Sequence, residues 1–147
     1  MNYWLVKSEP GSWSWQDHWS KKGRVEPWDG VRNHQAKAHM IAMKKGDRAF
    51  FYHSVGDREI VGICEVVKES YPDPTVKPDK LKKDGSNPWV CVDLKALRKV
   101  DPPITLDTIK ADAKLKDMVL VNNSRLSVQP VTAAEWKRVC KLGEVDA

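Results

Sequence analysis

The sequence has no apolar run long enough to cross a membrane and no leader-like start. The segment after Met1 is Asn-Tyr-Trp-Leu-Val-Lys, which lacks the basic stretch, apolar stretch and cleavage site of a signal peptide. No segment approaches the roughly 18 consecutive apolar residues of a membrane-spanning helix. We therefore expect a cytoplasmic protein with no membrane partner.

Cysteine is scarce, and its three copies are poorly spaced for a metal site. Cys64, Cys91 and Cys140 stand far apart among apolar neighbours, with no Cys-x-x-Cys pair. The four histidines, at positions 18, 34, 39 and 53, form no His-x-His or His-x-x-x-His pair. The pattern favours buried reduced thiols and predicts no metal.

Catalytic motifs are also missing. There is no GxxxxGK[ST] phosphate loop, no GxGxxG fingerprint and no GxSxG nucleophile elbow. A Ser-His-Asp triad is recognised by geometry, and nothing in the sequence sets one up. The sequence therefore predicts no cofactor and no catalytic residue, and favours a protein that is not an enzyme.

The chain is rich in tryptophan and moderately basic. Seven Trp exceed the three Tyr and two Phe combined, and 25 Lys and Arg against 20 Asp and Glu give a net charge of +5. Trp joins a flat apolar surface to one N–H donor, so the excess suits a well-anchored core or a stacking site. The 147 residues fit one domain, expected at 1–143 with a C-terminal tail at 144–147.

Periodicity and capping signals predict an α+β domain. Alternation over 3–8 predicts a strand, and further strands are expected at 48–54, 59–67, 89–97 and 125–131. Helices are expected to begin after Ser14, near Asn33, at Thr105 and after Thr132. Residues 26–30 and 101–103 are expected as a loop and a turn, and 71–88 as a long exposed loop. Such an order favours a strongly curved, mostly antiparallel sheet or small barrel with flanking helices.

Polar and aromatic residues gather at the ends of these predicted elements. The clusters are 7–10, 28–33, 51–54 and 71–73. Residues at the mouth of a small barrel can converge on one concave site. A planar base needs an aromatic face and surrounding donors and acceptors, and this mixture supplies both.

These blocks resemble the EVE domain closely. The similarity rests on Lys-Ser-Glu-Pro at 7–10, Gly-Val-Arg-Asn at 30–33, Phe-Tyr-His-Ser at 51–54, Tyr-Pro-Asp at 71–73 and Arg-Leu-Ser-Val-Gln-Pro-Val at 125–131. The resemblance implies a PUA-like pseudo-barrel related to YTH and ASCH domains. It also implies a non-catalytic reader of DNA or RNA, with a modified base, particularly modified cytosine, as the ligand.

The resemblance also implies a set of site residues. The expected base-binding residues are Ser8, Trp28, Asn33, Tyr52, His53, Ser54, Tyr71 and Ser127, and the expected phosphate-binding residues are Lys7, Arg32 and Arg125. A cage of two aromatic rings around the base would need a second aromatic residue beside Trp28, and Tyr71 or Trp89 would have to supply it. The protein is expected to be a monomer or a weak homodimer.

Structural roles compete with these assignments. Ser8 could close a turn, Asn33 could cap a helix, and Arg32 could pair with Asp29. Trp4, Trp13, Trp15, Trp19 and Trp136 are expected in the core, whereas Trp28 in its Pro/Gly loop is expected to stack on a base. Two other functions stay open: an enzyme acting on a nucleotide-like ligand with His53 as base, and a protein-interaction module built on exposed Trp residues.

Overall fold

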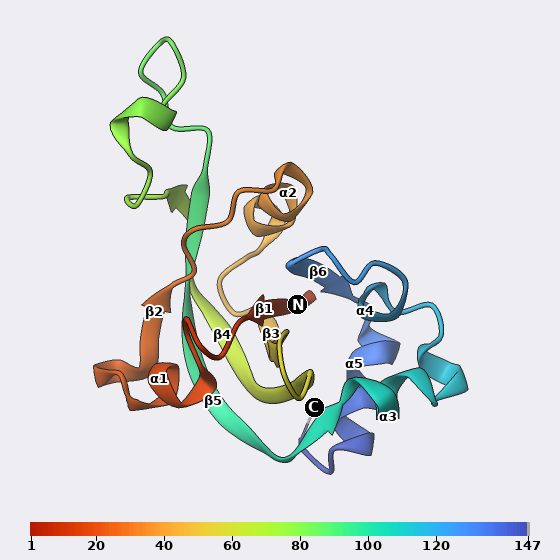
Figure 1. The fold of residues 1–147 in the computed structure, drawn as a ribbon. Helices are drawn as coiled ribbons and strands as arrows, with labels where there is room; N and C mark the ends of the chain where they lie inside the picture. Colours follow the sequence, from red (N-terminus) through yellow and green to blue (C-terminus); the bar gives the residue numbers. More distant parts are fainter. Residues whose placement is uncertain (147) are drawn as a thin grey trace.

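One strongly curved sheet of six strands organises the chain (Figure 1). The structure, a computed structural model, describes residues 1–146. The strand order is β2-β5-β4-β3-β1-β6; β1 and β3 are parallel, and every other neighbouring pair is antiparallel. The strands are β1 (Tyr3–Ser8), β2 (Val25–Pro27), β3 (Arg48–His53), β4 (Glu59–Pro72), β5 (Val90–Thr105) and β6 (Val128–Val131).

Within residues 1–146, five α-helices and three short 3-10 turns complete the fold. The helices are α1 (Trp15–Ser20), α2 (His34–Ala42), α3 (Leu106–Lys110), α4 (Val119–Asn122) and α5 (Ala133–Leu142). In Figure 1, α3, α4 and α5 gather on one side of the sheet, while α1 lies on the other. The predicted α+β class is confirmed, and so are the helix starts, because Ser14, Asn33, Thr105 and Thr132 each accept a backbone N–H as N-cap.

The sheet differs from the sequence prediction in four places. The strand expected at 59–67 runs on to Pro72 as β4, into the start of the loop expected at 71–88. The expected loop at 26–30 contains β2, which pairs with β5. The expected turn at 101–103 is part of β5, which runs on to Thr105 along β4. The last strand is shorter than expected because residues 124–125 form a turn before β6. Where a strand is added or extended, pairing with a distant strand outweighs the local sequence signal.

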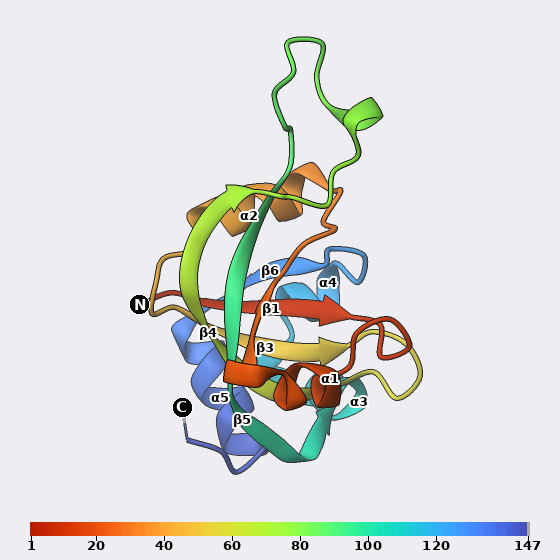
Figure 2. The ribbon, with the colours of Figure 1, turned by 90° about the vertical axis from the view of Figure 1, so that its left-hand side faces the viewer.

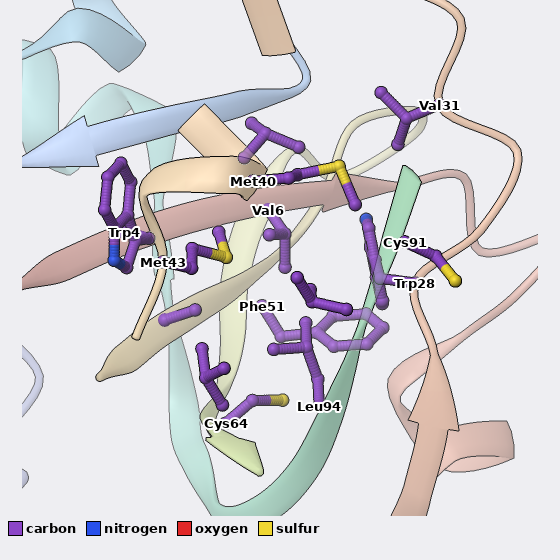
Figure 3. Packing of buried hydrophobic residues seen from close by; sticks show 14 of the residues in the cluster. Trp4, Val6, Trp28, Val31, Met40, Met43, Phe51, Cys64, Cys91 and Leu94 are labelled. Carbon is purple, nitrogen blue, oxygen red and sulfur yellow. The ribbon is translucent and has the colours of Figure 1, made fainter. Parts of the chain in front are cut away.

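Two hydrophobic cores lie on opposite sides of the sheet. Alternation along β1 sends Trp4 and Val6 into the first core, with α1 and α2, and Leu5 into the second, with α3 to α5. Figure 3 shows the first core, where Met40 and Met43 pack near Phe51 and Trp28. The second core centres on Trp136, whose ring stacks on Phe50 at 3.8 Å and on Tyr3 at 4.6 Å.

The segment between β4 and β5 projects away from the body of the fold (Figure 2). It carries Lys77, Lys80, Lys82 and Lys83, all exposed. At the other end of the chain, the tail expected at 144–147 stays a prediction. Val145 packs against the second core, and Ala147 lies outside the described residues. Among residues 1–146, no helix is both long and apolar enough to span a bilayer.

Candidate functional site

The parallel strands β1 and β3 end side by side and divide the predicted site between two faces. Their register pairs Lys7 with Tyr52 and Ser8 with His53. Successive side chains of a strand point to opposite faces. Ser8 and His53 therefore face the first core and α1, whereas Lys7 and Tyr52 face the second core.

A small cavity opens beside Trp28 on the first face. We call it the aromatic pocket; its volume is about 100 Å³, and it is lined by Trp13, Glu26, Pro27, Trp28 and Asp29. Trp28 is only 8% exposed and meets Phe51 edge to face at 5.3 Å (Figure 3). Its backbone N–H donates to Val92 O at 2.7 Å. Trp28 is thus a core residue that also forms one wall of a cavity, which a Pro/Gly loop context did not reveal.

His18 links the two indoles of the aromatic pocket. Its ring centroid lies 6.0 Å from Trp13 and 6.3 Å from Trp28, and its side chain is 0% exposed. Trp13 Nε1–H donates to His18 Nδ1 at 3.2 Å, so Nε2 carries the hydrogen and donates to Leu94 O at 2.8 Å. Burial lowers the pKa of His18, mainly by penalising the charged form. From the sequence, His18 was considered only as a metal ligand, and this role was missed.

The polar rim of the aromatic pocket is acidic. Burial raises the pKa of Asp29, and the nearby charges of Asp73 and Glu26 raise it further. Glu26 forms an ion pair with Lys21. The pocket therefore combines two indoles with two carboxyl groups that can accept hydrogen bonds.

Asp73 holds the 28–33 loop in place. It is 1% exposed, accepts from Gly30 N–H at 2.8 Å, and pairs with Arg32 Nη1 at 3.0 Å. Burial would raise the pKa of Asp73, but hydrogen bonds from Thr75, Gly30 and Arg32 outweigh it and lower the pKa. The carboxylate partner of Arg32 is thus Asp73, not Asp29, and the charge of Arg32 is already compensated.

Three predicted base contacts on this side make structural hydrogen bonds. Ser8 Oγ donates to Trp13 O and closes the turn after β1. Asn33 Oδ1 accepts from Ala36 N–H at 2.8 Å as the cap of α2. His53 Nε2 accepts the Trp15 N–H at 3.1 Å, which occupies the lone pair a general base would use.

The two candidates for a second cage aromatic lie at the base of the projecting segment. The Tyr71 hydroxyl donates to Asp93, and the Tyr71 ring packs partly on the first core. Trp89 stacks on His34 at 4.8 Å. Neither residue lines the aromatic pocket, where the second indole comes from Trp13 instead.

The remaining predicted residues lie on or beyond the other face. Tyr52 belongs to the second core, and Lys7, Tyr52 and Ser54 line a separate cavity. Lys7 N–H donates to Ser127 O at 2.9 Å, so Ser127 lies opposite Lys7 and shares its face. Arg125 is exposed in the turn before β6. Of the predicted residues, Trp28 thus lines the aromatic pocket, whereas Lys7, Tyr52 and Ser54 line another cavity. Alternation along β1 and β3 places Ser8 and His53 on one face and Lys7 and Tyr52 on the other.

Comparisons with known proteins give a consistent picture. The family model described as the EVE domain matches residues 2–142. Rpa0253 from Rhodopseudomonas palustris is 54% identical, covering 98% of this chain and 94% of its own, with a TM-score of 0.86. Human THYN1 protein, solved in complex with 5-methylcytosine-containing DNA, is 35% identical over 100% of both chains, with a TM-score of 0.90. Thymocyte nuclear protein 1 of Rattus norvegicus is 37% identical, covering 99% of this chain and 75% of its own length.

These relatives correct the expected localisation. The rat, mouse and human proteins that match this chain are all named as a nuclear protein. The expectation of a cytoplasmic protein rested on the absence of a leader and on reduced cysteines. Neither feature distinguishes the cytoplasm from the nucleus, and the expectation is wrong.

Proposed function

Since the chain belongs to the EVE domain family, we propose that it is a non-catalytic module that binds nucleic acid and accepts a modified cytosine in the aromatic pocket. The observation that carries the proposal is the human THYN1 relative, which shares the fold at a TM-score of 0.90 and is bound to DNA containing 5-methylcytosine. DNA is the proposed ligand, and RNA is tested beside it.

The chemistry of the aromatic pocket suits a flipped cytosine. A base taken out of the stack is held by stacking on aromatic side chains and by hydrogen bonds to its edge. Trp28 and Trp13 offer the aromatic surface, and the carboxyl groups of Glu26 and Asp29 can accept from the cytosine N4 amino group. An added 5-methyl group gains about 0.8 kcal/mol when it is buried against apolar atoms such as those of Pro27.

The other predicted residues take revised roles in this proposal. Ser8 and His53 position the Trp13 and Trp15 segment, while Asn33 and Arg32 position the loop that carries Trp28. Lys7, on the opposite face, and the exposed Arg125 are left for phosphates. Tyr52, Ser54 and Ser127 are assigned no base contact because they face away from the aromatic pocket.

The rival functions have less support. The neutral His53 ring accepts from a backbone N–H, so it has no free lone pair with which to activate a nucleophile. Exposed Trp residues were the basis for an interaction module, but all seven Trp are buried or half-buried. The large hydrophobic residues that are exposed are Met1, Ile41, Val55 and Leu81, which come from separate segments of the chain.

Binding of short single-stranded oligonucleotides tests the proposal. We would measure fluorescence anisotropy with DNA that carries one cytosine or one 5-methylcytosine, and with RNA of the same sequence. The wild-type protein should prefer methylated DNA by about fourfold, the equivalent of one buried methyl group. Asp29→Asn and Trp28→Phe should weaken binding to the methylated strand about 5- to 100-fold, the range of a lost base-edge contact or stack.

Asp57→Asn is the matched control, since it removes one carboxylate in the β3–β4 turn, away from the aromatic pocket. It should leave the methyl preference unchanged. Circular dichroism of each variant checks folding. Equal affinity of the wild-type protein for methylated and unmethylated DNA, with no loss in Asp29→Asn, would contradict the proposal.

A further inference from the structure

A second cavity, on the opposite face of the sheet from the aromatic pocket, has opposite chemistry. We call it the basic pocket; its volume is about 170 Å³, and it is lined by Lys7, Tyr52, Ser54, Arg58, Leu106, Leu120 and Ser124. The lining contains two cations, three hydroxyl groups and two leucines, but no carboxyl group. Such a lining suits an anion with several acceptor oxygens.

Lys7 enters this pocket as a half-buried cation with no counter-ion. Its Nζ donates to Ser124 O at 2.6 Å and lies 5.6 Å from the centre of the Tyr52 ring. Among residues 1–146, no carboxylate lies within ion-pair distance of Lys7. Burial lowers the pKa of its ammonium group. A charge withdrawn from water without a partner is unfavourable, so an anion in this pocket would be stabilised.

Arg58 supplies the second cation from the β3–β4 turn. Its backbone φ of 45° is unusual for a residue with a side chain, and Leu106 N–H fixes its carbonyl at 3.0 Å. Burial raises the pKa of Tyr52, and the nearby charge of Arg58 opposes that rise, which places the guanidinium near the phenol. Arg58 also forms no ion pair within the described chain. A strained backbone that directs an unpaired arginine at a cavity is typical of a binding site.

A neighbouring cleft of about 440 Å³ helps to locate the anion. It shares Ser54, Arg58 and Leu106 with the basic pocket but is also lined by Asp57 and Asp107. Those carboxylates would repel an anion. The inner cavity, which has none, is the part suited to one.

We propose that the basic pocket binds a phosphate group of the same nucleic acid whose base enters the aromatic pocket, with Lys7 and Arg58 as its cationic ligands. The inference rests on the proposed function. Lys7 and Ser8 are consecutive and point to opposite faces, so the two pockets flank the ends of β1 and β3. A nucleic-acid strand that crosses the ends of β1 and β3 would present a base to one face and a phosphate to the other. The Arg58 guanidinium can hold two phosphate oxygens, and the hydroxyls of Tyr52, Ser54 and Ser124 can donate to the rest.

The salt dependence of oligonucleotide binding tests this proposal. The wild-type protein, Lys7→Gln, Arg58→Gln and Lys110→Gln are titrated with a single-stranded 5-methylcytosine oligonucleotide at several salt concentrations. Loss of one phosphate contact should reduce the slope of log K against log salt by about 0.7. We expect this reduction in Lys7→Gln and Arg58→Gln. Lys110→Gln is the matched control, because Lys110 is exposed, lines the neighbouring cleft and is absent from the basic pocket.

Inorganic phosphate provides a second probe, followed by NMR of the backbone amides. Phosphate should shift the Ser54 and Ser124 amides in the wild-type protein and in Lys110→Gln, and not in Arg58→Gln. Absence of these shifts in the wild-type protein, or equal slopes in Arg58→Gln and Lys110→Gln, would overturn the proposal. Phosphate shifts with unchanged slopes would also overturn it, since the pocket would then take a free phosphate instead of a strand.

Failure of the proposed function gives a different result. If the wild-type protein binds methylated and unmethylated strands equally while Lys7→Gln and Arg58→Gln still reduce the slope, the base-reading function fails and the phosphate site stands. If the wild-type protein prefers the methylated strand but the slope of log K against log salt is the same in Lys7→Gln, Arg58→Gln and the wild-type protein, the phosphate site fails and base reading stands.

Discussion

The two pockets at the ends of β1 and β3 are built from adjacent residues but differ in every physical respect. The aromatic pocket is lined by two indoles and two carboxyl groups, and its Trp28 wall is part of the first core. The basic pocket is lined by two cations and three hydroxyls, and its cations come from a strand end and an exposed turn. The aromatic wall of the first pocket is therefore a core residue, whereas Arg58 of the second pocket is exposed. Changes to Trp28 should affect folding and binding together, whereas changes to Arg58 should affect binding alone.

The largest expected effect comes from truncating the core wall. Trp28→Ala should lower the free energy of unfolding by about 3–5 kcal/mol, because it removes a buried indole and leaves a cavity. Arg58→Ala, in the other pocket, should change it by no more than about 0.5 kcal/mol, as is usual for surface substitutions. Urea denaturation followed by circular dichroism measures both. Similar losses in the two variants would abolish the distinction between core and surface.

A second variant tests how α1 is seated beside the aromatic pocket. A Cβ atom on Gly62 of β4 would lie 2.3 Å from the Trp15 ring, so Gly62→Ala must displace α1 and the Trp13 turn before it. We expect a loss of about 1–3 kcal/mol, typical of overpacking, together with weaker binding of the base.

Gly11→Ala is the control for that substitution. A Cβ at Gly11 meets nothing within 4 Å, and its backbone needs no positive φ. Denaturant unfolding should show little change for it. If Gly62→Ala also left the free energy of unfolding unchanged, the contact between Trp15 and β4 would not determine the position of α1.

The smallest expected effect is a pH dependence of stability that arises from His18, beside the aromatic pocket. The pKa of His18 is lowered in the folded protein, so the unfolded chain binds a proton that the folded chain does not. Stability should therefore fall as the pH drops through about 6.5 toward the lower folded pKa, by at most about 1.4 kcal/mol per pH unit for one group. Below that range, protonation of Nδ1 would break the bond from Trp13.

Unfolding measured between pH 7.5 and 5 checks this prediction. His39 and His53 also have lowered pKa values through burial, so part of the wild-type slope belongs to them. His18→Gln should reduce the slope, whereas His34→Gln, at an exposed position, should leave it unchanged. Identical slopes in the wild-type protein and His18→Gln would show that His18 is not the titrating group.

Sequence reasoning predicted local structure well where the signal was local. The helix starts after Ser14 and Thr132 were predicted correctly because the two partners of each capping box lie within three residues of each other. Trp136 was correctly assigned to the core from helical spacing. Trp28 was expected to be free for stacking because its loop shows no periodicity, yet it is buried by β3 and β5, which lie far from it in the sequence.

The site was predicted less well, for a physical reason. The Arg32–Asp73 pair and the His18–Leu94 bond join residues 41 and 76 positions apart, and no local pattern encodes them. Arg58 and His18 were missed because each is unremarkable among its sequence neighbours. Their importance comes from what the fold places against them.

The sequence by itself determined the α+β class, the capped starts of four helices and the EVE resemblance, since these depend on short-range periodicity, capping and recurring blocks. Alternation along β1 even implied that Lys7 and Ser8 point apart. Only the tertiary structure decided which residues each of them contacts. The parallel pairing of β1 with β3 places Tyr52 beside Lys7 on one face and His53 beside Ser8 on the other. Burial then turned Trp28 into a pocket wall and left Lys7 a cation without a partner, because desolvation depends on packing from distant segments and not on neighbouring residues.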